Sequence, residues 1–221
     1  MHVNIIIPTI FRNELLAKTI HSLENSRYKD FSIIVVVDNN NEDLARFAQK
    51  LGVRKVILNK KRLGWPRSVN VGCQSVKEGG VFYASDDLIF DPQCIGNAVK
   101  ALKNKFPDGD GLIGIYQNLT KFCPAAFGLC GYKFINRFPN SQLMNPAYIH
   151  YCGDSELWRY AKKHDRFYLC ESAKVIHIRL KDQTKRLAHK TLLRDRKIWW
   201  ARKDRKSYWG DDFNIGDENV T

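Results

Sequence analysis

The chain contains 221 residues, of which 44% are hydrophobic and 27% are charged, an ordinary composition for a folded globular protein. This length allows one large domain or two small ones, and no stretch approaches the roughly 18 consecutive apolar residues of a membrane-spanning helix. The formal net charge of +13 indicates an anionic partner: nucleotide phosphates, a polyanionic acceptor, nucleic acid or an acidic membrane surface.

The N-terminus and the cysteines bear on the cellular compartment. Residues 1–8 predict a strand and a turn, without the charged lead, apolar run and cleavage site of a secretory signal. The six cysteines form no Cys-x-x-Cys pair and lie near apolar residues, which favours reduced thiols in a core over zinc ligands or disulfides. These features predict a cytoplasmic protein.

Strands and helices alternate in the first half of the chain. Runs of β-branched and aromatic residues predict buried strands at 3–7, 31–37, 55–58 and 81–84. Apolar residues at helical spacing predict helices at 12–23, 42–51, 67–77 and 93–105. This alternation predicts an α/β fold with a mostly parallel central sheet flanked by helices. Neither Gly-x-Gly-x-x-Gly nor the P-loop pattern follows a strand, which argues against a dinucleotide oxidoreductase and a P-loop NTPase.

The second half is less regular. A fifth strand is predicted at 112–116, and the Pro-, Gly- and aromatic-containing stretch 117–151 predicts an acceptor pocket or a mobile loop. A helix follows from Gly153, with Asp154 placed to cap it, and short strands are predicted at 167–169 and 174–178.

The C-terminal stretch is strongly basic. Residues 181–206 carry eleven Lys and Arg against three Asp, with Trp199 and Trp200 among them. This tail could lie peripherally on the anionic inner face of a membrane. It could also pack its apolar residues on the core or on a second subunit, and this packing is the favoured interpretation.

Two adjacent carboxylates, Asp86 and Asp87, follow the fourth predicted strand. Burying such a pair is unfavourable unless positive charge lies beside it. Ligands of open α/β sheets bind at the carboxyl ends of strands, and a divalent cation with phosphate oxygens in its shell would compensate the pair. The alternative is structural: either aspartate ends the strand, and Asp91-Pro92 begins the next helix.

Four features occur in one order: Pro8-Thr9 with Arg12 after the first strand, Asp38 at the end of the second, Asn59, Gly64, Arg67 and Asn70 after the third, and Ser85-Asp86-Asp87 after the fourth. This order resembles the nucleotide-sugar-binding half of family 2 glycosyltransferases, which have the GT-A fold. The later Asp154-Ser155-Glu156-Leu157 resembles that family's second acidic motif, and His177 resembles the histidine that often follows it. The resemblance covers roughly residues 3–180.

The resemblance implies roles for the matching residues at the donor. Nucleotide-sugar-binding residues would be Pro8, Thr9, Arg12, Asp38, Gly64, Arg67, Asn70 and Asp86. Asp38 would recognise the base, for which a carboxylate is a suitable acceptor. Asp87 and His177 would hold Mn²⁺ or Mg²⁺. Ser85 replaces the first aspartate of the family's D-x-D motif.

At the acceptor, Asp154 would be the base that deprotonates the attacking hydroxyl in an inverting transfer. Glu156 and Trp158 would contact the acceptor. Gly153 stands where the family usually has a glutamate.

The sequence therefore predicts a metal-dependent glycosyltransferase that moves a sugar from a nucleotide-diphosphate donor, with UDP favoured, to a saccharide, lipid-linked or protein acceptor. Residues 1–116 would bind the nucleotide sugar, 117–180 would form the acceptor and catalytic half, and 181–221 would be a basic helical extension with a frayed acidic end, which could also mediate a homodimer.

Two alternatives are a basic α/β nucleic-acid-binding protein and a nucleotidyltransferase on a similar fold. Nucleic acid is disfavoured because no helix-turn-helix, RNA-binding aromatic pair or zinc finger is present in the sequence. Nucleotidyl transfer would require a glycine-rich loop after the first strand, and 8–12 contains no glycine.

Overall fold

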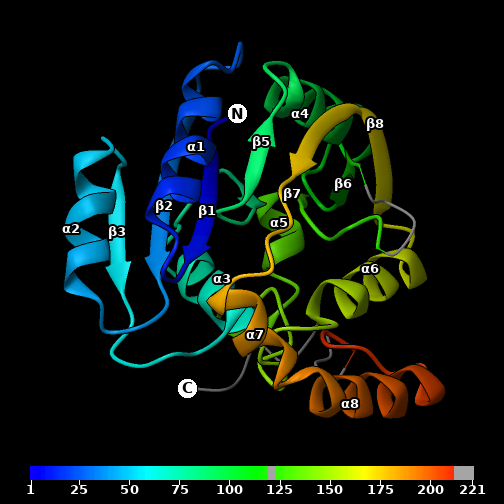
Figure 1. Cartoon of the computed structure of the whole chain (residues 1–221). Coiled ribbons are helices and arrows are strands. Elements are labelled where there is room, and N and C mark those ends of the chain that lie inside the picture. The colour runs from blue at the N-terminus through cyan, green and yellow to red at the C-terminus, as the bar shows by residue number, and fades with distance from the viewer. Residues whose placement is uncertain (119–122, 212–221) are drawn as a thin grey trace.

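One mixed sheet organises the protein, and helices pack on both of its faces (Figure 1). The structure is a computed structural model that describes residues 1–118 and 123–211. Within these residues the sheet has the strand order β3-β2-β1-β4-β7-β6-β8-β5. The strands are β1 (Val3–Thr9), β2 (Phe31–Val37), β3 (Lys55–Leu58), β4 (Gly80–Tyr83), β5 (Leu88–Phe90), β6 (Leu112–Gln117), β7 (Gly128–Cys130) and β8 (Phe167–His177). The helices are α1 (Asn13–Glu24), α2 (Glu42–Lys50), α3 (Trp65–Gln74), α4 (Cys94–Lys105), α5 (Tyr132–Ile135), the short 3-10 helix η1 (Pro139–Ser141), α6 (Gly153–Lys163), α7 (Gln183–His189) and α8 (Leu192–Arg205).

The first four strands confirm the predicted parallel arrangement. β1 pairs in parallel with β2 and with β4, and β2 pairs in parallel with β3. Ile6 lies opposite Ile34 on one side and Tyr83 on the other, in the middle of this group. Because these strands run in the same direction, the loops that follow them leave the sheet at one edge, where α/β proteins bind ligands.

The rest of the sheet is mixed. β7 is antiparallel to both β4 and β6, and β5 is antiparallel to β8. Strands β5 and β7, which have only three residues each, are not predicted from the sequence. The sequence pattern predicts two short strands where the single strand β8 lies. The pairing of β8 with β6 shifts register after Ile115, which leaves residues 171–173 without a partner in β6 and breaks the alternating pattern there.

Two apolar layers hold the helices to the sheet. Alternate side chains of β1 point to opposite faces, so Ile5 and Ile7 join one layer and Ile6 joins the other. Helices α1, α2 and α4 pack on the first layer, and α3, α5 and α6 pack on the second. Burial on both faces explains the continuous apolar runs Ile5–Ile7 in β1 and Ile33–Val37 in β2.

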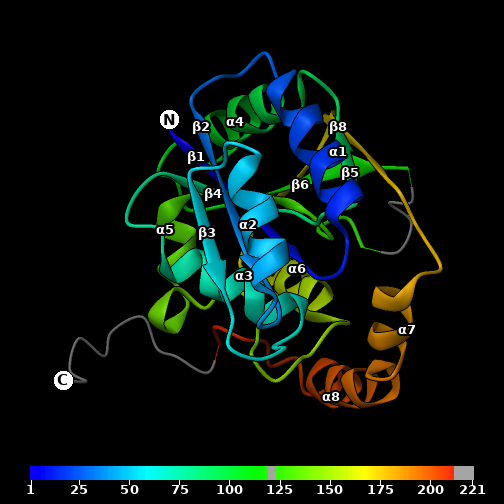
Figure 2. The same cartoon turned by 60° about the vertical axis from the view of Figure 1, so that its left-hand side comes forward.

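Helices α7 and α8 lie beyond the carboxyl ends of the parallel strands (Figures 1 and 2). Trp199 of α8 packs on the second apolar layer and stacks on Tyr208, with 6.4 Å between the ring centroids. The neighbouring Trp200 is 53% exposed. Among the described residues no helix has the length and apolar character needed to span a bilayer. The expected acidic end, residues 212–221, lies outside the described residues.

Gly64, at the start of α3, is a position where the backbone excludes any side chain. Its φ is +94°, and a Cβ atom there would collide with the carbonyl oxygen of Ile149. Gly64→Ala should therefore lower the free energy of unfolding by more than about 3 kcal/mol, because backbone strain and overpacking add. The measurement is equilibrium unfolding in urea.

Gly52→Ala is the matched control for this prediction. Gly52 also has a positive φ of +71°, but no atom lies within 4 Å of a Cβ built there. This substitution should cost only about 1 kcal/mol, the strain of a left-handed residue. Equal losses in the two variants would contradict the proposed collision at Gly64.

Candidate active site

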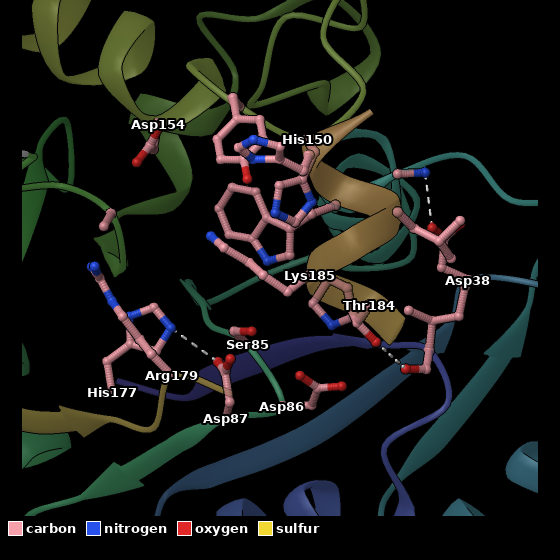
Figure 3. Close-up of a pocket in the computed structure, with 18 of the residues that line it drawn as sticks. Asp38, Ser85, Asp86, Asp87, His150, Asp154, His177, Arg179, Thr184 and Lys185 are labelled. Carbon is pink, nitrogen blue, oxygen red and sulfur yellow. Dashed lines mark hydrogen bonds and ion pairs between the residues drawn. The ribbon is translucent and has the colours of Figure 1, made fainter. Parts of the chain in front are cut away.

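A cavity of about 640 Å³ lies where β1, β2 and β4 end. Its floor is formed by residues at the ends of these strands or just after them, including Pro8, Thr9, Asp38 and the 85–87 segment. The opposite wall comes from residues before and at the start of α6 and from the C-terminal segment (Figure 3). The cavity therefore gathers polar side chains from loops far apart in the sequence.

Asp86 and Asp87 lie at the bottom of the cavity and are almost fully buried, with exposed fractions of 3% and 6%. Thr9 Oγ1 donates a hydrogen bond of 2.7 Å to Asp86 Oδ2. One guanidinium nitrogen, Arg12 Nη1, lies 3.0 Å from Asp86 Oδ1 and 2.8 Å from Asp87 Oδ2. Arg12 thus supplies the positive charge that a buried carboxylate pair requires.

The pKa values of the two carboxyl groups shift in opposite directions. Burial and the charge of Asp87 raise the pKa of Asp86 to about 6, although Arg12 and Thr9 oppose this rise. Burial also acts to raise the pKa of Asp87, but His177 and Arg12 outweigh it and hold that pKa below its usual value. Asp87 therefore loses its proton at a lower pH than Asp86 does.

Asp87 and His177 fit one side of a divalent-cation site. Asp87 Oδ1 is buried without a well-aligned hydrogen bond, and His177 Nε2 lies 3.3 Å away (Figure 3). On the other side of the ring, His177 Nδ1 lies 3.4 Å from Gln117 Oε1. Within residues 1–118 and 123–211, no three His, Cys, Asp or Glu side chains are grouped to hold a metal by themselves. The donor set suits Mg²⁺ or Mn²⁺, which one carboxylate can hold when ligand phosphates complete the shell.

Asp38 lies at the far end of the cavity from His177 (Figure 3). Its two oxygens accept hydrogen bonds from the backbone N–H groups of Leu63, at 2.7 Å, and Gly64, at 2.8 Å. Asn59 Nδ2 lies 3.2 Å from Oδ1. Asp38 therefore fixes the loop between β3 and α3, and this loop brings Gly64 to the cavity wall.

Asp154 lines the wall across from Asp87 (Figure 3). The helix begins at Gly153 as predicted, but Cys152, whose φ is +71°, occupies the N-cap position, so Asp154 lies inside the first turn and does not cap α6. Its Oδ1 accepts the backbone N–H of Ser155 at 2.8 Å. Burial raises the pKa of Asp154, while its hydrogen bonds to Ser155 and Cys123 oppose the rise.

Two of the predicted donor-binding residues face away from the cavity. Arg67 Nε donates to the carbonyl oxygen of Pro146 at 2.7 Å. Asn70 Nδ2 donates to Met144 O at 2.7 Å, and Asn70 Oδ1 accepts from Met144 N at 2.8 Å. Neither side chain lines the cavity. Both instead join α3 to the segment that leads into the opposite wall.

The two predicted acceptor-binding residues also lie outside the cavity lining. Glu156 is fully buried, and its Oε1 accepts from Arg202 Nε at 2.7 Å and from Trp209 N at 2.5 Å. Trp158 packs edge-on against Phe167, with 6.4 Å between the ring centroids. Glu156 therefore joins α6 to the end of α8 and to the residues that follow it.

A group of cavity residues, mostly basic or aromatic, is not predicted from the sequence: Arg62, Trp65, His150, Tyr151, Arg179, Lys185 and Arg196. Three of them belong to the C-terminal basic stretch or the residues just before it. The only signal in the sequence was the excess of positive charge, which does not say where the charges meet.

His150 should make the stability depend on pH. Burial, and then the charges of Lys185 and Arg62, lower its pKa to about 4, with Arg12 adding to this effect and Asp195 opposing it. In the unfolded chain this histidine takes up a proton near pH 6.5. Between about pH 6.5 and 4 the unfolded state thus binds the extra proton, so His150 lowers the free energy of unfolding as the pH falls.

Replacing His150 with glutamine should remove this part of the pH dependence of the free energy of unfolding. Urea unfolding of both proteins from pH 4.5 to 8 measures that dependence. Above about pH 7.5 the difference in unfolding free energy between the two proteins should be constant, and below pH 6.5 it should shift in favour of His150→Gln. Parallel profiles over the whole range would contradict the prediction.

Known proteins are similar to the chain in sequence and in fold. The profile described as glycosyl transferase family 2 matches residues 4–144. No curated protein matches the sequence. The structure of the mannosyltransferase PcManGT from Pyrobaculum calidifontis, in complex with GDP-Man and Mn²⁺, has a TM-score of 0.70 at 13% identity, over 92% of this chain and 64% of that one.

Two structures of TarS from S. aureus are also similar. The structure of TarS residues 1–349 gives a TM-score of 0.63 at 14% identity, over 99% of this chain and 74% of that one. The other gives 0.58 at 13% identity, over 93% of this chain and 42% of that one. At these identities the similarity establishes the fold, and the chain spans only 64% of the mannosyltransferase. Because the family profile covers more than half of the sequence, the chain belongs to glycosyl transferase family 2, and its fold is the GT-A fold of these enzymes.

Proposed function

We propose that this protein transfers a sugar from a nucleotide-diphosphate donor, with UDP-sugars favoured, to an acceptor hydroxyl with inversion. One cavity is lined by Asp38, Asp86, Asp87 and Asp154, and loops far apart in the sequence contribute these residues. This observation carries the proposal. Membership of glycosyl transferase family 2 supports the reaction class. Asp38 at one end of the cavity supports binding of the nucleoside there, and the neighbour with GDP-Man makes guanine the competing base.

The donor's diphosphate would lie against Asp87 and His177. These residues would hold Mn²⁺ or Mg²⁺, and the Mn²⁺ in the mannosyltransferase structure supports this choice. A bound cation neutralises the charge that develops on the leaving diphosphate. Arg12 keeps Asp86 and Asp87 in place, and Thr9 orients Asp86.

Asp154 is the proposed base. A base must be ionised at the working pH and gains proton affinity as its pKa rises toward that pH. Burial moves the pKa of Asp154 in this direction. Its position across the cavity from Asp87 supports attack by an acceptor hydroxyl from the face opposite the leaving diphosphate, which is the geometry of inversion.

The nature of the acceptor, whether saccharide, lipid-linked molecule or protein, stays a prediction. So do the cytoplasmic location, a membrane contact through the basic tail and a homodimer. The exposed side chains of Leu193 and Trp200 on α8 support the tail as the contact surface in either case.

Asp87→Asn should abolish metal-dependent binding of the nucleoside diphosphate while preserving the shape of the side chain. An amide removes the charge that holds a divalent ion, so added Mn²⁺ should no longer raise the affinity for UDP or GDP in calorimetric titrations. Asp91→Ala is the control, since Asp91 is exposed four residues further along and does not line the cavity. An unchanged response to Mn²⁺ in Asp87→Asn would remove Asp87 from the metal site.

Asp154→Asn should bind the donor normally but lose transfer by about 10²–10⁴-fold, the usual contribution of a general base. In the wild type, the turnover rate should fall with decreasing pH at a value above the ordinary aspartate pKa, because burial raises the pKa of Asp154. Product formation and donor titration measure the two effects. Asp165→Asn is the control, on the turn that ends α6 and outside the cavity. A fully active Asp154→Asn would exclude Asp154 as the base.

A further inference from the structure

We propose that the C-terminal segment 179–196 completes the cavity with a cationic wall, formed by Arg179, Lys185 and Arg196 with Arg62, that binds the diphosphate of the donor. This inference rests on the proposed function and assigns part of its binding site. The family match ends at residue 144, so the segment lies outside the part of the chain that the family profile describes.

The segment forms a continuous part of the cavity lining. Its contributions are Arg179, Leu180, Thr184, Lys185, Leu187, His189, Leu192 and Arg196. Helix α7 crosses the cavity in Figure 3, and Lys185 extends from it into the middle of the site. The basic stretch is therefore part of the site wall over this length.

The segment is attached to the strand ends at the base of α7. Arg12 Nε donates to Asp182 Oδ2 at 2.7 Å, and Arg12 Nη2 lies 3.2 Å from Asp182 Oδ1. Thr184 Oγ1 donates to the carbonyl oxygen of Ile10 at 3.0 Å. The guanidinium that holds the buried carboxylate pair thus also fixes the start of α7.

A second attachment joins α8 to the opposite wall. Asp195 is fully buried, and its carboxylate accepts the backbone N–H groups of Ile149 at 3.2 Å, His150 at 2.9 Å and Tyr151 at 2.9 Å. This wall leads directly into α6, which carries Asp154. Both helices of the segment are therefore fixed to residues that line the cavity.

The cations of the wall lack carboxylate partners. Arg12 is matched by Asp86, Asp87 and Asp182. In contrast, Arg62, Arg179, Lys185 and Arg196 form no ion pair with any described residue. Unpaired cations gathered on one wall favour a multiply charged anion beside that wall.

The surroundings of His150 show that these charges act at the same place. The charges of Lys185 and Arg62 disfavour its protonated form, which adds to the effect of burial. Lys185 Nζ also lies 5.5 Å from the ring centre of the adjacent Tyr151. Residues from the loop after β3 and from α7 therefore produce a positive potential at the same wall.

The position of Lys185 favours the donor's diphosphate over an acidic acceptor. Figure 3 shows Lys185 between Asp38, at one end of the cavity, and Asp87 with His177 at the other. In a nucleotide sugar the diphosphate joins the nucleoside to the sugar, so it must cross this middle region. Phosphate oxygens there would accept charge-assisted hydrogen bonds from the lysine and the arginines.

The test compares ligands that differ in their phosphates. Lys185→Ala and Arg179→Ala should each weaken binding of UDP, or of GDP if that is the better ligand, by about 10-fold, the usual effect of losing one charged hydrogen bond. They should weaken binding of inorganic pyrophosphate similarly and leave the affinity for the free nucleoside unchanged. The loss of affinity should diminish at high salt. Calorimetric titration with Mg²⁺ present measures these affinities.

Arg186→Ala is the matched control, because it removes one charge from the exposed face of α7 without touching the cavity. It should bind all ligands as the wild type does. Unchanged UDP and pyrophosphate affinities in Lys185→Ala and Arg179→Ala would overturn the inference, and so would a change confined to the KM of the acceptor.

Failure of the proposed function would look different. In that case pyrophosphate would still bind in a Lys185-dependent way, which supports the cationic wall, but attaching uridine or guanosine to it would add no affinity. A wild-type protein that binds neither nucleoside diphosphates nor pyrophosphate would reject both proposals.

Discussion

The contact between Arg12 and the buried Asp86–Asp87 pair is the interaction on which the site depends. Two adjacent carboxylates at the end of a buried strand repel each other and lose their hydration, and neither effect is tolerable without a cation. Arg12 binds both groups through one nitrogen and reaches Asp182 through the others. One side chain therefore joins the end of β1, the end of β4 and the start of α7.

This arrangement explains which parts of the fold could be predicted from the sequence. The centres of β1, β2 and β4 are apolar runs because both faces of the sheet are covered there, and such runs are recognisable without tertiary information. Asp38 and Asp87 follow two of these strands. Since parallel strands end at the same edge, their convergence in one cavity follows from the strand order alone.

The rest of the site depends on contacts that a sequence does not encode locally. Arg67, Asn70 and Glu156 match positions of a family pattern, yet their side chains bind backbone or charged groups outside the cavity. Lys185 and Arg196 lie in a basic stretch that resembles any solvated helix. The packing of α7 on the strand ends and of α8 on the opposite wall brings them to the cavity, and no local periodicity predicts that packing.

The burial of Glu156 links the helix that carries Asp154 to residues far along the chain. Its carboxylate accepts hydrogen bonds from Asn145, from Arg202 and from the backbone N–H of Trp209. Arg202 is the cation among these groups, and a buried carboxylate that loses its cation is strongly unfavourable. A change at Arg202, outside the cavity, would therefore disturb the wall that holds Asp154.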